Sequence, residues 1–293
     1  MSLPPIQQFD AAASGPDRPE TPGSGAKRVP NLGHAALFLV FAAMLFFLLQ
    51  LALVMLGLSP VKQSGGQITV QHPMLQLAVL AATYAGTLAG AWLFFPLLWH
   101  RPFLEGLQWR WSAARPLAWR LLALGLLSGL TIAFLDQFIA QPTTAEIDQF
   151  FVTPLAAWEI TLFGIFVAPV FEEIAFRGML LPAFAIAVDW LRIPRTAESY
   201  ANWQSGVGIS NAAWFISAAL TSALFVWLHA QQVGYAWGVL AALYCVSLFL
   251  TAVRLRLGSV AASAMVHAAY NGLIFLAALL ATGGYRHLER MHR

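Results

Sequence analysis

Two adjacent carboxylates and an arginine are the most unusual residues of this sequence, because they lie in an apolar stretch. Glu172, Glu173 and Arg177 occur within Phe171–Gly178, inside an apolar run over about Leu155–Trp190. Ionisable groups in a membrane-spanning helix cost roughly 3 kcal/mol each on the insertion scale, and they usually mark a functional site. This segment is therefore the first candidate for chemistry.

The spacing of the three residues suggests different roles for the two acids. Neighbouring residues on a helix point about 100° apart, so Glu172 and Glu173 cannot face one cavity in the same way. Glu173 and Arg177 are four residues apart in the favourable order for an ion pair, and we expect them to neutralise each other and brace the helix. Glu172 then remains free to act as a general base. The alternative is one buried charge network without chemistry.

Further polar residues occur in two later apolar segments. His229 follows Phe225 by four residues, so the aromatic ring can form a wall beside the imidazole. His267 and Asn271 are also four apart and project from one helix face. A single residue of this kind could serve only in interhelical hydrogen bonding, worth about 1 kcal/mol. Polar sites on three separate segments instead indicate a shared cavity.

The chemistry that this set of residues could perform is the activation of water. Glu172 could take a proton from water that His229 orients, while His267 and Asn271 donate hydrogen bonds to a developing oxyanion. This would be peptide hydrolysis without a covalent intermediate. Glu172, His229 and His267 could instead hold a divalent metal such as zinc, and spacing does not separate the two options. The sequence contains no His-Glu-x-x-His, Gly-x-Ser-Gly or Gly-x-Gly-Asp motif.

Composition identifies the elements that must position these residues. Hydrophobic residues make up 59% and charged residues 10% of the 293 residues, against about 45–50% and about 25% in soluble proteins. We therefore predict an all-α polytopic transmembrane bundle of about seven spans, with eight as the alternative. The net charge of +3 is small, and the basic residues lie between apolar segments, which argues against a nucleic-acid partner. The expected partners are membrane lipids and a peptide or protein substrate.

Seven apolar segments have the length of a membrane span, about 20 residues. They are Ala35–Leu58, Met74–Trp99, Pro116–Ala140, Leu155–Trp190, Asn211–His229, Gly234–Val253 and Ser259–Thr282. The fourth is too long for one simple crossing, and we expect it to tilt, leave the membrane, or break near Pro169 or Pro182. Gly86 and Gly90 form a Gly-x-x-x-Gly pair, which predicts close helix packing.

The distribution of Lys and Arg predicts a cytoplasmic N-terminus, and the compact size of the chain points to the cell (inner) membrane. Basic residues alternate cleanly between loops up to Arg254 and Arg256, but three arginines follow the last span on the predicted outer side, namely Arg286, Arg290 and Arg293. The predicted divisions are a disordered tail (1–33), N-terminal transmembrane helices (34–153), a catalytic transmembrane core (154–282) and a short basic tail (283–293).

This topology places His229 near the outer end of its span, so Glu172 must reach the same depth. Counted from Leu155, Glu172 is about 17 residues or roughly 26 Å down, which is too deep. We therefore predict that Leu155–Leu162 lies partly outside the hydrocarbon core, or that the fifth helix continues past Gln232. Two groups that share one water must also lie close, so the Glu172 carboxylate should come within about 8 Å of the His229 ring.

The three motifs together resemble those of the CAAX protease and bacteriocin-processing (CPBP, or Abi) family. They are Glu-Glu-x-x-x-Arg at 172–177, Phe-x-x-x-His at 225–229 and His-x-x-x-Asn at 267–271, in that order on separate spans. The resemblance covers about residues 154–282.

The resemblance implies an intramembrane endopeptidase. By it, Glu172 is the catalytic acid/base, aided by His229, while His267 and Asn271 stabilise the oxyanion and Glu173 and Arg177 support the site. The family is often called metalloprotease, although a metal-free glutamate mechanism is also argued for it, and we favour the latter. The alternative from a different class is a non-enzymatic membrane carrier or binding scaffold with a buried Glu/His network.

Overall fold

The chain is a bundle of long helices. The structure, a computed structural model, describes residues 28–58, 61–64, 67–70, 72–139, 146–204 and 208–292. Within these ranges seven helical stretches are long and apolar enough to cross a membrane, which agrees with the expected number of about seven. They are Leu32–Met55, Pro73–Trp99, Trp111–Phe138, Pro154–Arg192, Asn211–His229, Trp237–Leu257 and Val260–Ala281. The prediction of an all-α polytopic membrane protein is confirmed.

Five of the seven spans are single helices. These are α1 (Leu32–Met55), α2 (Pro73–Trp99), α10 (Asn211–His229), α11 (Trp237–Leu257) and α12 (Val260–Ala281). The third span joins α4 (Trp111–Ala114), a 3-10 turn (Arg115–Leu117), α5 (Ala118–Leu135) and a second 3-10 turn (Asp136–Phe138). The fourth is a long helix that contains α6 (Pro154–Leu162), α7 (Ala168–Glu173) and α8 (Leu181–Arg192).

Short elements connect the spans. They are a hairpin of β1 (Val61–Ser64) and β2 (Gln67–Val70), α3 (Phe103–Gly106), a 3-10 turn (Glu146–Phe150), α9 (Ala197–Gln204) and a final 3-10 turn (Leu288–His292). Residues 1–27 of the predicted tail lie outside the described residues. Helix α1 already begins at Leu32, because the Asn31 side chain accepts a hydrogen bond from the His34 N–H and caps it.

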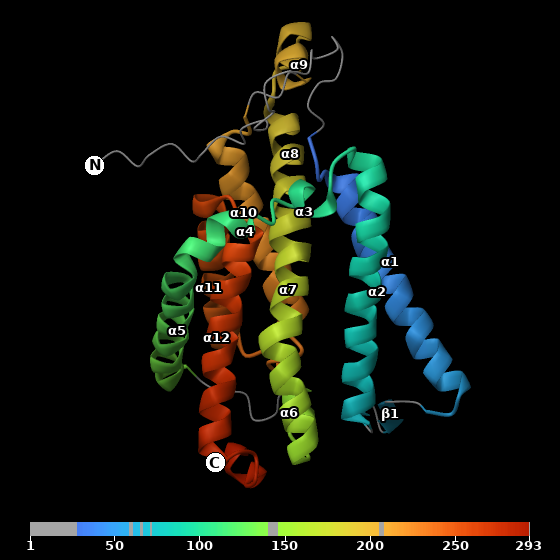
Figure 1. Ribbon diagram of the computed structural model, residues 1–293, viewed down its shortest axis with the longest axis vertical. Helices are drawn as coiled ribbons and strands as arrows, with labels where there is room; N and C mark the ends of the chain where they lie inside the picture. The colour runs from blue at the N-terminus through green and yellow to red at the C-terminus, as the bar shows by residue number, and fades with distance from the viewer. Residues whose placement is uncertain are drawn as a thin grey trace.

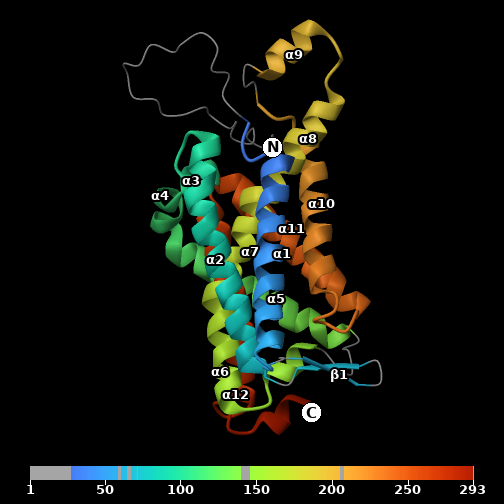
Figure 2. The same cartoon turned by 90° about the vertical axis from the view of Figure 1, so that its right-hand side faces the viewer.

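The long fourth helix runs through the middle of the bundle (Figure 1). Helices α1 and α2 lie on one side of it and α10 to α12 on the other, and Figure 2 shows α1 between α2 and α10. This central position brings the Glu-Glu-x-x-x-Arg motif next to both histidine-bearing helices.

Helix α12 is held in place by close packing against α5. A Cβ atom added to Gly125 of α5 would clash with the backbone oxygen of Val266, and one added to Gly129 would lie 2.8 Å from Leu273. The predicted Gly86–Gly90 pair acts in the same way between α2 and α1, where added Cβ atoms would lie 2.5 Å from Leu45 and Phe41. Small residues thus let the backbones approach closely.

The fourth span does not break at its prolines. It widens instead into two π-helical turns, Phe163–Val167 and Ile174–Leu180, each directly before a residue–proline pair. The N–H of Ala168 donates to the carbonyl of Phe163, five residues back, and Leu181 donates to Phe176 in the same way. A proline ring clashes with the carbonyl four residues before it, and the wider turn relieves this clash without ending the helix.

The depth of the central motif can be measured against the loop that joins α3 to α4. In this loop (residues 107–110), Leu107 lies close to Gly178, and the Gln108 carbonyl accepts a hydrogen bond from the N–H of Val260. Glu172 is six residues from Gly178, and His267 is seven residues from Val260. At 1.5 Å per residue both lie about 10 Å from the level of this loop.

The ends of the fourth and fifth spans differ from one expectation. Helix α10 ends at His229, and residues 230–235 form a turn with a left-handed backbone at Gly234, so the fifth helix does not continue past Gln232. The fourth span extends about 21 Å beyond Gly178 on the α8 side. On the other side Pro154 lies about 36 Å from Gly178, more than the roughly 30 Å of a hydrocarbon core. It stays a prediction that Leu155–Leu162 lies partly outside the hydrocarbon core.

Candidate active site

Glu172 faces a histidine on each of two other helices. One carboxylate oxygen, Oε1, lies 3.9 Å from Nε2 of His229 at the end of α10, and the other, Oε2, lies 3.7 Å from Nε2 of His267 in α12. The 3.9 Å separation is well within the limit of about 8 Å expected for two groups that share a water. The side chains of Glu172 and His229 are 15% and 19% exposed, so small molecules can reach them.

Both imidazole rings use their Nδ1 atoms for a second contact. His229 Nδ1 lies 2.7 Å from the carbonyl oxygen of Phe225, which can only accept, so Nδ1 carries the hydrogen. His267 Nδ1 lies 3.0 Å from Oε1 of Glu173 and donates to that carboxylate. Each Nε2 therefore points toward Glu172 as a lone pair in the neutral ring and as a donor in the imidazolium.

Glu173 belongs to a fully buried charge network. Arg177 donates from Nη1 to Glu173 Oε1 at 2.9 Å, and both side chains are 0% exposed. From Nη2, Arg177 donates to the backbone carbonyl and to the hydroxyl of Ser247 on α11, at 2.9 and 2.8 Å. The carboxylate of Glu173 thus joins the arginine to His267. The sequence did not indicate that one imidazole would contact both acids.

Phe225 forms the expected wall beside the imidazoles. Its ring stacks on His229 with centroids 4.2 Å apart, and it meets His267 edge-on at 6.1 Å. The Arg177 guanidinium lies over the same Phe225 ring, 5.0 Å from its centroid. One aromatic ring therefore limits the positions of three polar groups.

Asn271 makes a contact that the sequence did not suggest. Its amide nitrogen Nδ2 donates to the backbone carbonyl of Gly164, in the first π turn, at 2.8 Å. His267 and Asn271 share a face of α12, but His267 contacts the two glutamates whereas Asn271 contacts the Gly164 carbonyl.

The N-terminal helices also contribute to the site. The Phe171 ring, next to Glu172, stacks on Tyr84 of α2 with centroids 3.7 Å apart and on Phe38 of α1 at 5.8 Å. Sequence analysis missed these two residues, because isolated aromatic residues in apolar spans are indistinguishable from ordinary packing residues. Phe38 and Tyr84 pack against the side of α7 that is opposite α10 and α12 (Figure 1).

The chemistry of the donor set suits a metal, but its arrangement does not. Glu172, His229 and His267 offer a carboxylate and two nitrogens, and both rings donate Nδ1–H elsewhere, as metal-binding histidines commonly do. Within the described residues, however, no three His, Cys, Asp or Glu side chains converge as a metal site requires. If a metal is bound, these three residues would hold it, and it would polarise the substrate carbonyl or a water.

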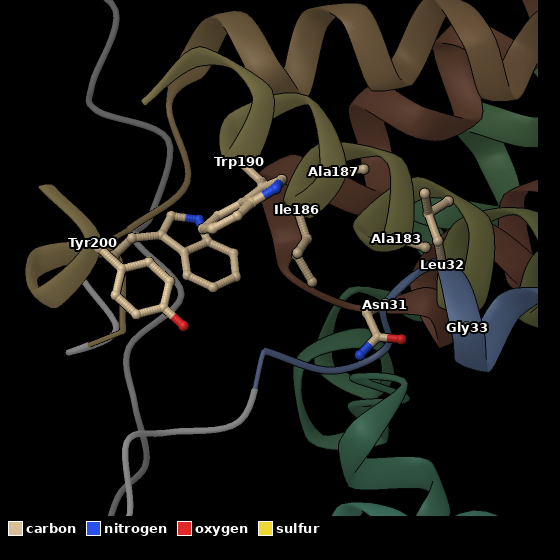
Figure 3. Close-up of a pocket in the computed structure, with 9 residues that line it drawn as sticks. Asn31, Leu32, Gly33, Ala183, Ile186, Ala187, Trp190 and Tyr200 are labelled. Atoms are coloured by element: carbon tan, nitrogen blue, oxygen red, sulfur yellow. The ribbon is translucent and has the colours of Figure 1, made fainter. Parts of the chain in front are cut away.

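A separate pocket lies at the α8 end of the molecule. It has a volume of about 320 Å³ between the start of α1, α8 and α9, and Trp190 and Tyr200 lie around it (Figure 3). Its lining contains neither an acid nor a histidine. The carboxylate–histidine cluster is therefore the candidate for chemistry.

The comparisons with known proteins concern the helices that carry this cluster. A search of curated proteins and a search of solved structures each found no match. Residues 154–273, less than half of the chain, match the sequence model of a family described as type II CAAX prenyl endopeptidase Rce1-like. The matched segment begins with α6 and ends within α12, so it contains all three motifs. Residues 154–273 are therefore similar to the Rce1-like type II CAAX prenyl endopeptidases, in agreement with the resemblance seen in the motifs.

Proposed function

We propose that the protein is an intramembrane endopeptidase that hydrolyses a peptide bond of a membrane-associated or lipidated protein or peptide. The observation that carries this proposal is the placement of Glu172 between two imidazole Nε2 atoms, at 3.9 and 3.7 Å. The Rce1-like match supports a CAAX-type endopeptidase, and the seven apolar helices support a multi-pass membrane protein. We further propose the cell (inner) membrane as its location, with the N-terminus in the cytoplasm.

The proposed reaction begins with water at the Glu172 carboxylate. Glu172 takes a proton from this water while neutral His229, whose Nδ1–H is donated to Phe225, accepts a hydrogen bond from the water at Nε2. The water oxygen then forms a bond to the carbonyl carbon of the substrate, and the carbonyl electron pair moves onto its oxygen. Protonated Glu172 returns the proton to the amide nitrogen as the carbon–nitrogen bond breaks.

The proposed oxyanion donors come from α12. Because His267 donates Nδ1–H to Glu173, its Nε2 can donate to an oxyanion only when the ring carries a second proton. One hydrogen of the Asn271 amide is already given to Gly164, so only its second hydrogen remains for an oxyanion. Glu173 and Arg177 act as the support that fixes the His267 ring.

The proposal is tested by cleavage in liposomes. The purified full chain is reconstituted with prenylated and unprenylated peptides that end in a CAAX-type sequence, and products are identified by mass spectrometry. We expect one specific cleavage that is lost in Glu172→Gln and in His229→Ala, while both variants remain monodisperse. Full activity in Glu172→Ala would end the water-activation proposal. If the wild-type chain binds the peptides but cleaves none, the alternative of a non-enzymatic carrier or scaffold is favoured.

A further inference from the structure

The contact between Asn271 and Gly164 is explained by the proline that follows the first π turn. In a regular α-helix the Gly164 carbonyl would accept from the N–H of residue 168, but Ala168 donates to Phe163 instead. In this shifted register the next donor for Gly164 is residue 169, and Pro169 has no N–H. The carbonyl is therefore left without a backbone donor.

An unpaired backbone carbonyl is costly inside a membrane bundle, because no bulk water is available to satisfy it. The Asn271 amide nitrogen lies 2.8 Å from this oxygen and is the donor that replaces the missing N–H. The hydrogen bond joins α12, which carries His267, to the turn that leads into α7.

The register shift also determines which side chains face the histidines. One extra residue in the turn rotates everything after it by about 100° relative to a regular helix. Glu172 follows Ala168 by only four residues, so the directions in which the Glu172 and Glu173 side chains point depend on this turn. In the observed register Glu172 lies against both Nε2 atoms, and Glu173 contacts Nδ1 of His267.

We propose that Asn271 is a positioning residue, whose amide substitutes for the N–H that Pro169 lacks and thereby holds the π turn that orients Glu172. This role differs from that of an oxyanion donor, which needs no partner in the π turn between α6 and α7. It predicts that the need for Asn271 depends on the proline. The activity part of this inference rests on the proposed peptidase function, whereas the stability part does not.

The test is a double-variant cycle with Asn271→Ala, Pro169→Ala and the two combined. In the Pro169→Ala background, residue 169 regains an N–H for the Gly164 carbonyl. We expect Asn271→Ala alone to lower the Tm of the purified full chain by about 3–6 °C, and to lower kcat about 10- to 100-fold with little change in KM. In the Pro169→Ala background both losses should shrink by at least half.

Pro182 provides the matched control, because it also follows a π turn directly. Pro182→Ala should not reduce either effect of Asn271→Ala. Equal losses of Tm in both Pro169 backgrounds would overturn the positioning role. Asn271→Ala alone could fail to fold. In that case, folded protein from the double variant with Pro169→Ala supports the inference. If the double variant does not fold although Pro169→Ala alone does, the inference is contradicted.

The two proposals fail in distinguishable ways. If wild-type protein cleaves no peptide, the proposed function is wrong, but the Tm cycle still decides the positioning role. If wild-type protein cleaves and Pro169→Ala restores stability but not kcat, the amide stabilises the turn without orienting Glu172, and the positioning role is overturned.

Discussion

Glu172 and Glu173 are the same residue type one position apart, yet they meet opposite surroundings. Glu173 is fully buried, and its carboxylate accepts hydrogen bonds from Arg177 and His267. The Glu172 side chain is 15% exposed, and its shortest contact with a histidine among the described residues is 3.7 Å, to His267. A carboxylate held by two partners is a structural counter-ion. One that faces two imidazoles across a small gap can exchange a proton with water.

The two glutamates should therefore respond differently to the same substitution. Glu173→Gln removes the negative charge beside a guanidinium that is 0% exposed, and breaking such a buried pair costs about 3–5 kcal/mol. Glu172→Gln should leave stability within about 1 kcal/mol while abolishing cleavage. Thermal unfolding in detergent and the peptide assay measure the two effects. Equal destabilisation by both variants would contradict the separation of roles.

Removal of divalent metals tests the metal-free version of the site. We expect cleavage to survive dialysis against a strong chelator, because the proposed reaction uses only the Glu172 carboxylate and the two imidazoles. The measurement is the cleavage rate together with the metal content of the same sample. Loss of activity that added zinc restores would instead assign Glu172, His229 and His267 as metal ligands.

The local pairs of the site could be predicted from the sequence, but the contacts between helices could not. Four-residue spacing on one helix was enough to indicate the Glu173–Arg177 pair and the Phe225–His229 stack. The bridging position of His267 depends on the rotation of α12 against α7, which spacing within one helix does not contain. The Asn271–Gly164 contact requires knowledge of a register shift 107 residues earlier in the chain.

At the level of elements, the position of α12 depends on two glycines of α5. Span number and approximate span limits follow from hydropathy, because each span must satisfy the same membrane thickness. The second Gly-x-x-x-Gly pair, Gly125 and Gly129, was not singled out, and only the structure shows that it faces α12. The π turns were also missed, since prolines in an apolar segment equally suggest a kink or a break.

Substitution of Gly125 should disturb the site without touching it. In Gly125→Ala the new Cβ meets the backbone oxygen of Val266, one residue before His267, so α12 must move away. We expect lower thermal stability and a cleavage rate reduced about ten-fold or more. Both are measured on protein purified in the same detergent as wild type.

Gly272, on α12, provides the matched control. An added Cβ there has no atom within 4 Å, and alanine is favoured over glycine in a helix by about 1 kcal/mol. Gly272→Ala should therefore keep full activity and unchanged or higher stability. A similar loss in Gly125→Ala and Gly272→Ala would show that α5–α12 packing does not position His267.

At the scale of the whole molecule, the family match and the site do not have the same limits. The match begins at residue 154, but Phe38 and Tyr84 from α1 and α2 pack on Phe171 directly beside Glu172. The predicted division between N-terminal helices (34–153) and catalytic core (154–282) therefore describes the sequence motifs, and the packed unit includes both parts.

If all seven candidate helices cross the membrane, Leu32 at the start of α1 and Ala281 at the end of α12 lie on opposite sides of it, despite the arginines after α12. The C-terminal segment is anchored at the α6 end of the bundle, where the buried Tyr285 hydroxyl lies 2.7 Å from that of Thr161. The loop of residues 107–110 and the α11–α12 turn meet at the opposite end. Orientation is set mainly by the basic residues of earlier short loops, so a short basic tail after the last span can be tolerated.

Reporters that are active on only one side of the membrane test this arrangement. We expect a fusion at the N-terminus to report the cytoplasm and a fusion after residue 293 to report the outer side. Because the 107–110 loop joins the second and third spans, a cysteine placed at Gln108 in a Cys245→Ser background should react with a membrane-impermeant thiol reagent only from the cytoplasmic side. Labelling of that cysteine from outside would invert the topology.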